Sequence, residues 1–124
     1  MDDTKTLHKV FVYGTLRTGS KETYKVPGRL YSLGWFPGIS LNQDGDESSK
    51  VICELREVDD ETLQEFDDYE GYYKDNPEGS LYIRQKITSE EGVEAWIYVY
   101  NRPDFLEPAD LIPSGDWSDR VSYA

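Results

Sequence analysis

The sequence predicts an α+β fold, a small and mostly antiparallel β-barrel with one main flanking helix. Three observations support this prediction. Several short segments rich in β-branched and aromatic residues are separated by polar connectors that contain glycine or proline, which is typical of strands joined by turns. Only residues 59–71 combine a capping residue, an apolar stripe at helical spacing and a terminal glycine. The length of 124 residues fits one domain. We therefore expect a single domain over residues 1–124, with a flexible N-terminus at residues 1–8.

The first half of the chain contains the first predicted strands. Residues 10–13 are apolar and stop at Gly14, which indicates a buried strand that leads into a glycine-containing loop. An apolar-rich stretch follows at residues 28–36, and Pro37 and Gly38 are expected to close it as a turn. Residues 42–49 are polar and predict a hairpin tip or a longer loop.

The second half contains the helix and a hairpin. Residues 51–56 alternate, and the face shared by Val51, Cys53 and Leu55 predicts a half-buried strand in which Cys53 belongs to the core. Asp59 or Asp60 can cap a helix that Gly71 ends. Residues 81–88 and 93–100 predict two strands joined by a turn at residues 89–92. The tail from residue 103 shows no clear period.

Charge and cysteine content exclude several classes of function. The chain has 13 Lys and Arg against 25 Asp and Glu, a formal net charge of −12. Such a surface repels nucleic acid and anionic membranes, so we expect neither as a partner. A single cysteine excludes an internal disulfide and suits a reducing compartment. Because the sequence also has no long apolar run and no signal-peptide pattern at its start, we expect a cytoplasmic protein.

Three local patterns resemble known sites but do not fit them. Residues 14–21 nearly match a phosphate-binding loop, yet Lys21 does not directly follow the second glycine. His8 is the only histidine and lies near the N-terminus, which disfavours a metal site or a catalytic triad. Residues 42–46 alternate like calcium ligands, but Glu47 replaces the required glycine. We therefore expect no metal and no organic cofactor.

Glu70 is the candidate that the helix register singles out. On a helical wheel it lies about 20° from Leu63 and about 40° from Phe66, so its carboxyl faces the sheet. Desolvation there would raise its pKa into the range useful for proton transfer near neutral pH. Asp67 is a competing candidate, about 40° to the other side of Leu63. The alternative is an ion pair of Glu70 with Arg84 or Lys86, and register alone favours that structural role.

Two further features are candidates for the wall of a binding pocket. The glycine loop at residues 14–16 presents backbone amides that can bind an anion or an oxyanion without a cationic side chain. Most aromatic residues of the predicted strands should be core, while one or two tyrosine hydroxyls can line a pocket. These aromatic residues are Tyr13, Tyr82, Trp96, Tyr98 and Tyr100.

The order of these motifs resembles the gamma-glutamyl cyclotransferase-like superfamily, in particular its small gamma-glutamylamine cyclotransferase branch. The resemblance covers nearly the whole chain and rests on residues 10–17, 28–30, 33–34, 37–38, 53–55, 58, 63–71, 95–100 and 114–117. Its most specific parts are the Tyr-Gly-Thr-Leu sequence at residues 13–16 and the Glu-Gly pair at the end of the helix.

The resemblance implies a small β-barrel in which the loop and the glutamate meet in one cavity. The implied substrate-binding residues are Tyr13, Gly14, Thr15 and Leu16, and Glu70 rather than Asp67 is the implied general acid/base. It implies that a small γ-glutamyl amide is cleaved when its own α-amine attacks the γ-carbonyl, which releases 5-oxoproline and a free amine.

The segment at residues 72–79 has no residue with a nameable substrate role, although we expect it to border the pocket. Two alternatives stay open. One is a non-catalytic module that binds a small molecule or a protein on the same fold. The other is removal of a γ-glutamyl protecting group in a biosynthetic pathway.

Overall fold

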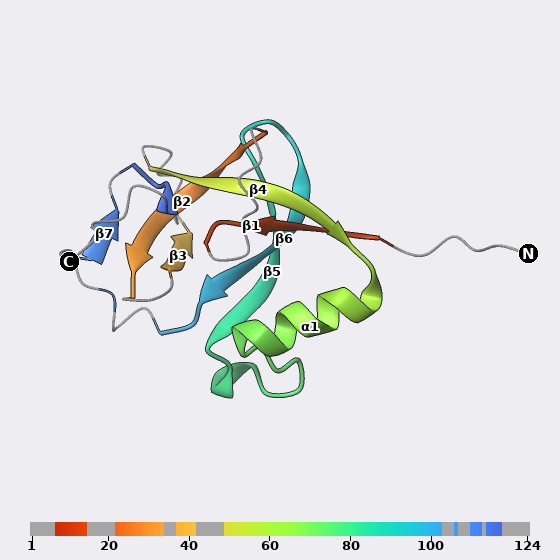
Figure 1. Ribbon diagram of the computed structural model, residues 1–124. Coiled ribbons are helices and arrows are strands. Elements are labelled where there is room, and N and C mark those ends of the chain that lie inside the picture. The colour runs from red at the N-terminus through yellow and green to blue at the C-terminus, as the bar shows by residue number, and fades with distance from the viewer. Residues whose placement is uncertain are drawn as a thin grey trace, which may run out of the picture.

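The computed structural model of the protein describes residues 7–14, 22–33, 37–41, 49–102, 106, 110–112 and 114–117. The described residues form a seven-stranded sheet in the order β3-β2-β4-β1-β6-β5, with β7 paired to β2. The strands are β1 (His8–Val12), β2 (Tyr24–Ser32), β3 (Pro37–Leu41), β4 (Lys50–Val58), β5 (Tyr82–Thr88), β6 (Glu94–Tyr100) and β7 (Leu111–Ile112). A helix, α1 (Asp60–Glu70), connects β4 to the segment before β5, which contains a short 3-10 helix, η1 (Pro77–Gly79). Figure 1 shows α1 on one side of the curled sheet.

The sheet curls because β2 takes part in two ladders. The first half of β2, Tyr24 to Pro27, pairs with β4, whereas the second half pairs with β3 and, at Leu30 and Tyr31, with β7. The partner changes between Pro27, which has no N–H to donate, and Gly28, which has no side chain to obstruct a bend. At the far end β3 contacts β6. All pairings are antiparallel except β1 with β6, so the predicted mostly antiparallel barrel with one helix is confirmed.

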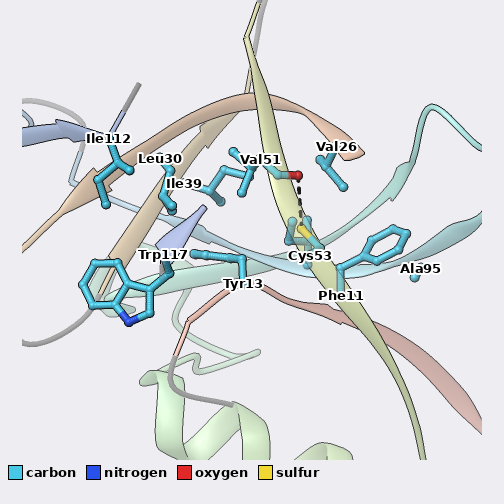
Figure 2. Close-up of a cluster of buried hydrophobic side chains, with 11 residues drawn as sticks. Phe11, Tyr13, Val26, Leu30, Ile39, Val51, Cys53, Ala95, Ile112 and Trp117 are labelled. Atoms are coloured by element: carbon cyan, nitrogen blue, oxygen red, sulfur yellow. Dashed lines mark hydrogen bonds between the residues drawn. The ribbon is translucent and has the colours of Figure 1, made fainter. Parts of the chain in front are cut away.

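Strand β1 and the residue after it divide the interior into two cores. Phe11 and Tyr13 point into the barrel, where they pack with residues such as Cys53 and Trp117 (Figure 2). Val10 and Val12 point to the opposite face and pack against α1. The alternation of side chains along a strand produces this division. Cys53 is fully buried, as its position in the alternating strand predicts.

Helix α1 begins and ends at the residues that the sequence indicates. Asp59 is its N-cap and accepts a hydrogen bond from the Thr62 N–H at 2.9 Å. Gly71 ends the helix at a φ of 68°, a conformation that glycine adopts without steric cost. Leu63 and Phe66 are buried against the sheet. Within the described ranges, no helix combines the length and apolar character needed to span a bilayer.

Three details differ from the sequence prediction. Pro37 and Gly38 do not form a turn but begin β3, because a proline is tolerated as the first residue of a strand. The tail contributes β7, a two-residue strand that is too short to show a period. Strand β1 begins at His8, inside the segment expected to be flexible, and the His8 ring contacts the Asp60 carboxylate. Residues 1–6 lie outside the described residues.

Candidate active site

A cavity of about 200 Å³ lies where β1 ends, between the barrel core and the core that packs on α1. Its wall comes from β1, the start of β3, the end of α1 and the two strands of the β5–β6 hairpin. The lining residues are Phe11, Val12, Tyr13, Gly14, Pro37, Tyr69, Glu70, Leu81, Tyr82 and Tyr98. The structure therefore brings together three of the residues singled out in the sequence, Tyr13, Gly14 and Glu70. Thr15 and Leu16 lie outside the described residues.

Glu70 supplies the only carboxylate among the described lining residues. It is the last residue of α1, directly before Gly71, so the helix end aims its side chain into the cavity. Burial raises the pKa of the Glu70 carboxyl from 4.5 to about 7. None of the described residues forms an ion pair with it. Arg84 pairs with Asp67, and Lys86 pairs with Glu94, so the structure does not support the alternative ion pair of Glu70.

Three tyrosines surround Glu70, and each directs its hydroxyl to an acceptor elsewhere in the protein. Tyr13 donates to the Tyr98 carbonyl oxygen at 2.6 Å, and Tyr82 donates to the Pro37 carbonyl oxygen at 2.5 Å. Tyr98 donates to Asp67 Oδ1 at 2.6 Å. Burial is the largest cause that raises the pKa of all three hydroxyls, and the nearby negative charge of Glu70 is one of the smaller causes. These tyrosines therefore stay neutral and form an apolar surround for the carboxyl group.

Asp67, the competing candidate, lies one helical turn before Glu70 in different surroundings. Its two carboxylate oxygens accept hydrogen bonds from Arg84 Nη1 at 3.1 and 3.0 Å, and it also accepts the Tyr98 hydroxyl. The Arg84 guanidinium carbon lies 4.7 Å from the ring centre of Trp96 and 5.4 Å from that of Tyr72. Asp67 does not line the cavity. The network instead ties α1 to the β5–β6 hairpin.

Gly14 permits a close backbone approach at the edge of the cavity. A Cβ atom at this position would lie 2.4 Å from Pro37 Cγ and 2.8 Å from Pro37 Cδ, which is closer than van der Waals contact allows. The proline ring has little freedom to move aside. A glycine is therefore required for β1 to pass next to the start of β3 and complete this wall.

The segment at residues 72–79 does not line the cavity, contrary to the prediction from the sequence. Residues 72–76 line a separate cleft together with residues of α1 such as Asp60 and Gln64. Ser80, which is fully buried, holds the segment in place, because its hydroxyl accepts the Tyr73 N–H at 2.8 Å and donates to the Asn76 carbonyl oxygen at 3.0 Å. These hydrogen bonds fix the backbone just before Leu81, the residue that follows Ser80.

Sequence reasoning did not identify five of the lining residues as such: Phe11 and Val12, which were predicted only as a buried strand, and Pro37, Tyr69 and Leu81. Pro37 was expected in a turn, and its place in the wall depends on pairing between β2 and β3. Tyr69 is next to Glu70 in the sequence, and this proximity could have predicted its place in the cavity wall. Leu81 reaches the cavity because its N–H bonds the Gly71 carbonyl oxygen at 2.9 Å, a contact that no sequence pattern indicates.

Taken together, the cavity holds one carboxyl group that is both protonated and ionised in appreciable amounts near pH 7. Such a group can accept a proton and return it in the next step, which suits general acid/base chemistry. The described residues contain no group of three or more His, Cys, Asp or Glu side chains arranged to hold a metal ion.

Comparisons with known proteins identify the family of this chain. The family model described as gamma-glutamyl cyclotransferase, AIG2-like, matches residues 10–119. A predicted gamma-glutamylcyclotransferase of Vibrio cholerae is 39% identical over 127 residues, which cover 92% of this chain and 98% of that protein. The gamma-L-glutamyl-butirosin B gamma-glutamyl cyclotransferase of Niallia circulans is 34% identical over 79% of this chain and 70% of its own length.

A solved structure shows the same fold at lower identity. A protein of Pyrococcus horikoshii superposes with a TM-score of 0.65 and 19% identity, over 90% of this chain and 91% of that protein. The chain therefore belongs to the gamma-glutamyl cyclotransferase, AIG2-like family and is an enzyme of the gamma-glutamyl cyclotransferase type.

Proposed function

We propose that the protein cleaves a small γ-glutamylamine and releases 5-oxoproline and a free amine, with Glu70 as general acid/base. In this reaction the substrate's α-nitrogen forms a bond to the γ-carbonyl carbon, and the bond from that carbon to the leaving nitrogen breaks. The α-ammonium loses two protons in total and the leaving nitrogen gains two, so the products are a lactam and an ammonium ion. Neither water nor a redox partner is consumed.

The observation that carries the proposal is the carboxyl of Glu70 in an apolar cavity, with a pKa of about 7. An α-ammonium cannot attack a carbonyl, so a base must first remove a proton. The leaving amine must later receive one, and a carboxyl titrating near neutrality can do both in turn. Ring closure is intramolecular, so the cavity needs only to hold the folded conformer of the substrate.

In the proposal, the other expected site residues bind the substrate. The ring of Tyr13 forms part of the buried floor, and Gly14 lets the Pro37 ring pack directly against the backbone, which completes the wall at this edge. The backbone amides of residues 14–16, including Thr15 and Leu16, would bind the substrate carboxylate or the developing oxyanion.

The test is 5-oxoproline release from γ-glutamyl amines, γ-glutamyl amino acids and glutathione by the purified protein and its Glu70→Gln variant. General acid/base catalysis contributes roughly 10²- to 10⁴-fold, and the variant should lose kcat by about that factor. Glu65→Gln is the matched control, because Glu65 is an exposed carboxylate of the same helix and should keep wild-type turnover.

Near wild-type turnover by folded Glu70→Gln would overturn the role of Glu70. Ligand binding without 5-oxoproline release from any of these compounds would instead indicate a non-catalytic binding module on this fold.

A further inference from the structure

Arg84 places a poorly hydrated positive charge close to the end of α1. Its side chain is 13% exposed, the Asp67 side chain is 9% exposed, and Arg84 Nη1 lies 3.0 Å from Asp67 Oδ2. The guanidinium lies over the rings of Trp96 and Tyr72, and its Nε is buried without a hydrogen-bond partner among the described residues. Because water screens this charge poorly, the Asp67 carboxylate is needed to cancel it.

Asp67 is also a close neighbour of Glu70. Residues three apart on a helix have Cβ atoms about 5–6 Å from each other, on the same face. The Tyr98 hydroxyl, which donates to Asp67 Oδ1 at 2.6 Å, belongs to a side chain that lines the cavity together with Glu70. A change of charge at Asp67 or Arg84 therefore acts on the Glu70 carboxyl across about one helical turn of poorly hydrated protein.

The other titratable groups around Glu70 are neutral or lie outside the cavity. Phenol groups are neutral near pH 7. From β4, which packs on α1, come Glu54 and Arg56, but neither lines the cavity, and Arg56 lies over the Phe66 ring. Asp67 and Arg84 are the described charges that reach the lining, through the Tyr98 hydroxyl. The tyrosines of the lining are Tyr13 after β1, Tyr69 on α1, Tyr82 on β5 and Tyr98 on β6.

Resting on the proposed function, we propose that Asp67 is a positioning residue for the reaction, which binds Arg84 and the Tyr98 hydroxyl so that neither a net positive charge nor this donor acts on Glu70. A cation or a hydrogen-bond donor next to a carboxylate stabilises the ionised form and lowers the pKa. Glu70 would then be a weaker base for the substrate's α-ammonium. The proton affinity of Glu70 thus depends on the cancellation of charge between Asp67 and Arg84.

Three variants test this dependence through the sign of their effects. Asp67→Asn keeps an oxygen that can accept the Tyr98 hydroxyl but leaves the Arg84 charge uncancelled, so the pKa of Glu70 should fall by about one pH unit or more. Arg84→Met leaves the Asp67 carboxylate without its cation, so the pKa of Glu70 should rise by a similar amount. The double variant Asp67→Asn/Arg84→Met has neither charge and should titrate near wild type.

Opposite shifts that cancel in the double variant are not expected from a merely structural role. Loosening of the packing between α1 and the β5–β6 hairpin would hydrate Glu70. Hydration favours the ionised form of a carboxyl, so all three variants would then shift the pKa of Glu70 in the same direction, downwards.

Two measurements report the pKa of Glu70. The first is a ¹³C NMR titration of the glutamate carboxyl carbons, in which the Glu70 signal is assigned by its loss in Glu70→Gln. The second is the acid limb of kcat/KM for 5-oxoproline release from γ-glutamylbutylamine, which reports the same group in the free enzyme. At pH 6 wild type should retain about a tenth of its plateau value, and Asp67→Asn about half of its own plateau value.

Glu94→Gln is the matched control for charge. Glu94 pairs with Lys86 on the same hairpin, and Lys86 Nζ lies 5.1 Å from the centre of the Trp96 ring that Arg84 also covers. Because both members of this pair are exposed, solvent screens their charges, and the variant should leave the pKa of Glu70 unchanged. If Asp67→Asn does not fold, Arg84→Met against the double variant isolates the same charge, and the pKa of Glu70 should be higher in Arg84→Met.

The outcomes separate this inference from the proposed function. An unchanged pKa of Glu70 in folded Asp67→Asn and Arg84→Met, or shifts in the same direction in all three variants, would overturn the role of Asp67. Absence of 5-oxoproline from every γ-glutamyl compound, together with the expected NMR shifts, would reject the proposed function and leave the control of Glu70 by Asp67 supported.

Discussion

Two carboxylates on the inner face of α1 lie one turn apart and have opposite surroundings. Asp67 accepts three hydrogen bonds, two from Arg84 and one from the Tyr98 hydroxyl, and does not line the cavity. Glu70 faces the cavity, where burial raises its pKa to about 7 and no described residue forms an ion pair with it. Both acids face the sheet, so burial alone does not distinguish them. The two acids are distinguished by the position of Arg84, which pairs with Asp67.

The register of the β5–β6 hairpin places Arg84 and Tyr82 beside different acids. Arg84 and Tyr98 are directly opposite in the β5–β6 ladder, and Tyr82 is two residues earlier on β5. Asp67 accepts hydrogen bonds from Arg84 and Tyr98, whereas Glu70, three residues later in α1, lines the cavity together with Tyr82. Asp67 therefore forms a structural ion pair with the hairpin, and Glu70 lies in an apolar cavity beside it.

The largest effect on stability is expected when the ion pair is broken. Asp67→Asn keeps the shape of the side chain but leaves the Arg84 guanidinium buried without its counter-charge. Loss of one partner of a buried pair costs about 3–5 kcal/mol. We expect that decrease in the free energy of unfolding, measured by urea denaturation, while kcat of the folded fraction stays within a few-fold of wild type.

Glu94→Gln is the control for this experiment. Its partner Lys86 has a side chain that is 53% exposed, and the carboxylate side chain of Glu94 is 64% exposed. Exposed pairs contribute about 0–1 kcal/mol, so this variant should be nearly as stable as wild type. If Asp67→Asn were as stable as wild type but lost kcat as strongly as Glu70→Gln, the division of roles between Asp67 and Glu70 would be wrong.

The next effect is the pH dependence that Glu70 imposes on stability. Its pKa is about 7 in the folded state against 4.5 for the unperturbed group, so the folded state binds the proton more tightly. This contribution is fully present below pH 4.5 and is lost as the pH rises through 7, up to a maximum of about 3 kcal/mol. Wild type should therefore lose stability between pH 5 and pH 8 relative to Glu70→Gln.

Urea denaturation at these two pH values checks the sign directly. Above pH 7 the Glu70→Gln variant should be more stable than wild type, although it is the less active protein. Glu65→Gln should instead follow the wild-type curve. A wild-type protein that gains stability relative to Glu70→Gln as the pH rises would mean that the folded state favours the ionised form of the Glu70 carboxyl.

Sequence patterns predicted the local parts of this arrangement and missed the non-local ones. Asp59 and Gly71 marked the ends of α1, and the wheel placed Glu70 on its buried face. The wheel also placed Asp67 within the same stripe, so it could not tell which acid Arg84 would meet. That choice depends on the register of β5 against β6 and on the packing of α1 on both strands, which link residues far apart in the chain.

The parallel pairing of β1 with β6 and the strand that begins at Pro37 are non-local in the same way. A Pro-Gly pair has local turn chemistry, and only the neighbouring strands make it the start of β3. The union of the loop at Tyr13 and Gly14 with Glu70 in one cavity came from the family resemblance, not from any spacing in the chain. Leu81, rather than residues 72–79, borders the cavity, and its N–H bonds the Gly71 carbonyl oxygen, a contact that no sequence pattern indicates.

The smallest expected effect tests whether the end of α1 positions Glu70 separately from Asp67. Gly71 has a φ of 68°, and its N–H bonds the carbonyl oxygens of Asp67 and Asp68 while its own carbonyl oxygen accepts the Leu81 N–H. Gly71→Ala should cost about 1–2 kcal/mol, because a side chain disfavours this conformation. An added Cβ would lie 3.4 Å from the Leu81 Cβ, an ordinary contact, so the loss is conformational.

Gly92→Ala is the matched control, because Gly92 has a φ of 83° and no atom within 4 Å of an added Cβ. Both variants should lose similar stability in urea denaturation. Only Gly71→Ala should also lower kcat, by a few-fold, because it shifts the residue next to Glu70 and leaves the pair of Asp67 with Arg84 intact. An equal kcat in the two variants would mean that the Glu70 carboxyl is positioned by the cavity wall rather than by the helix end.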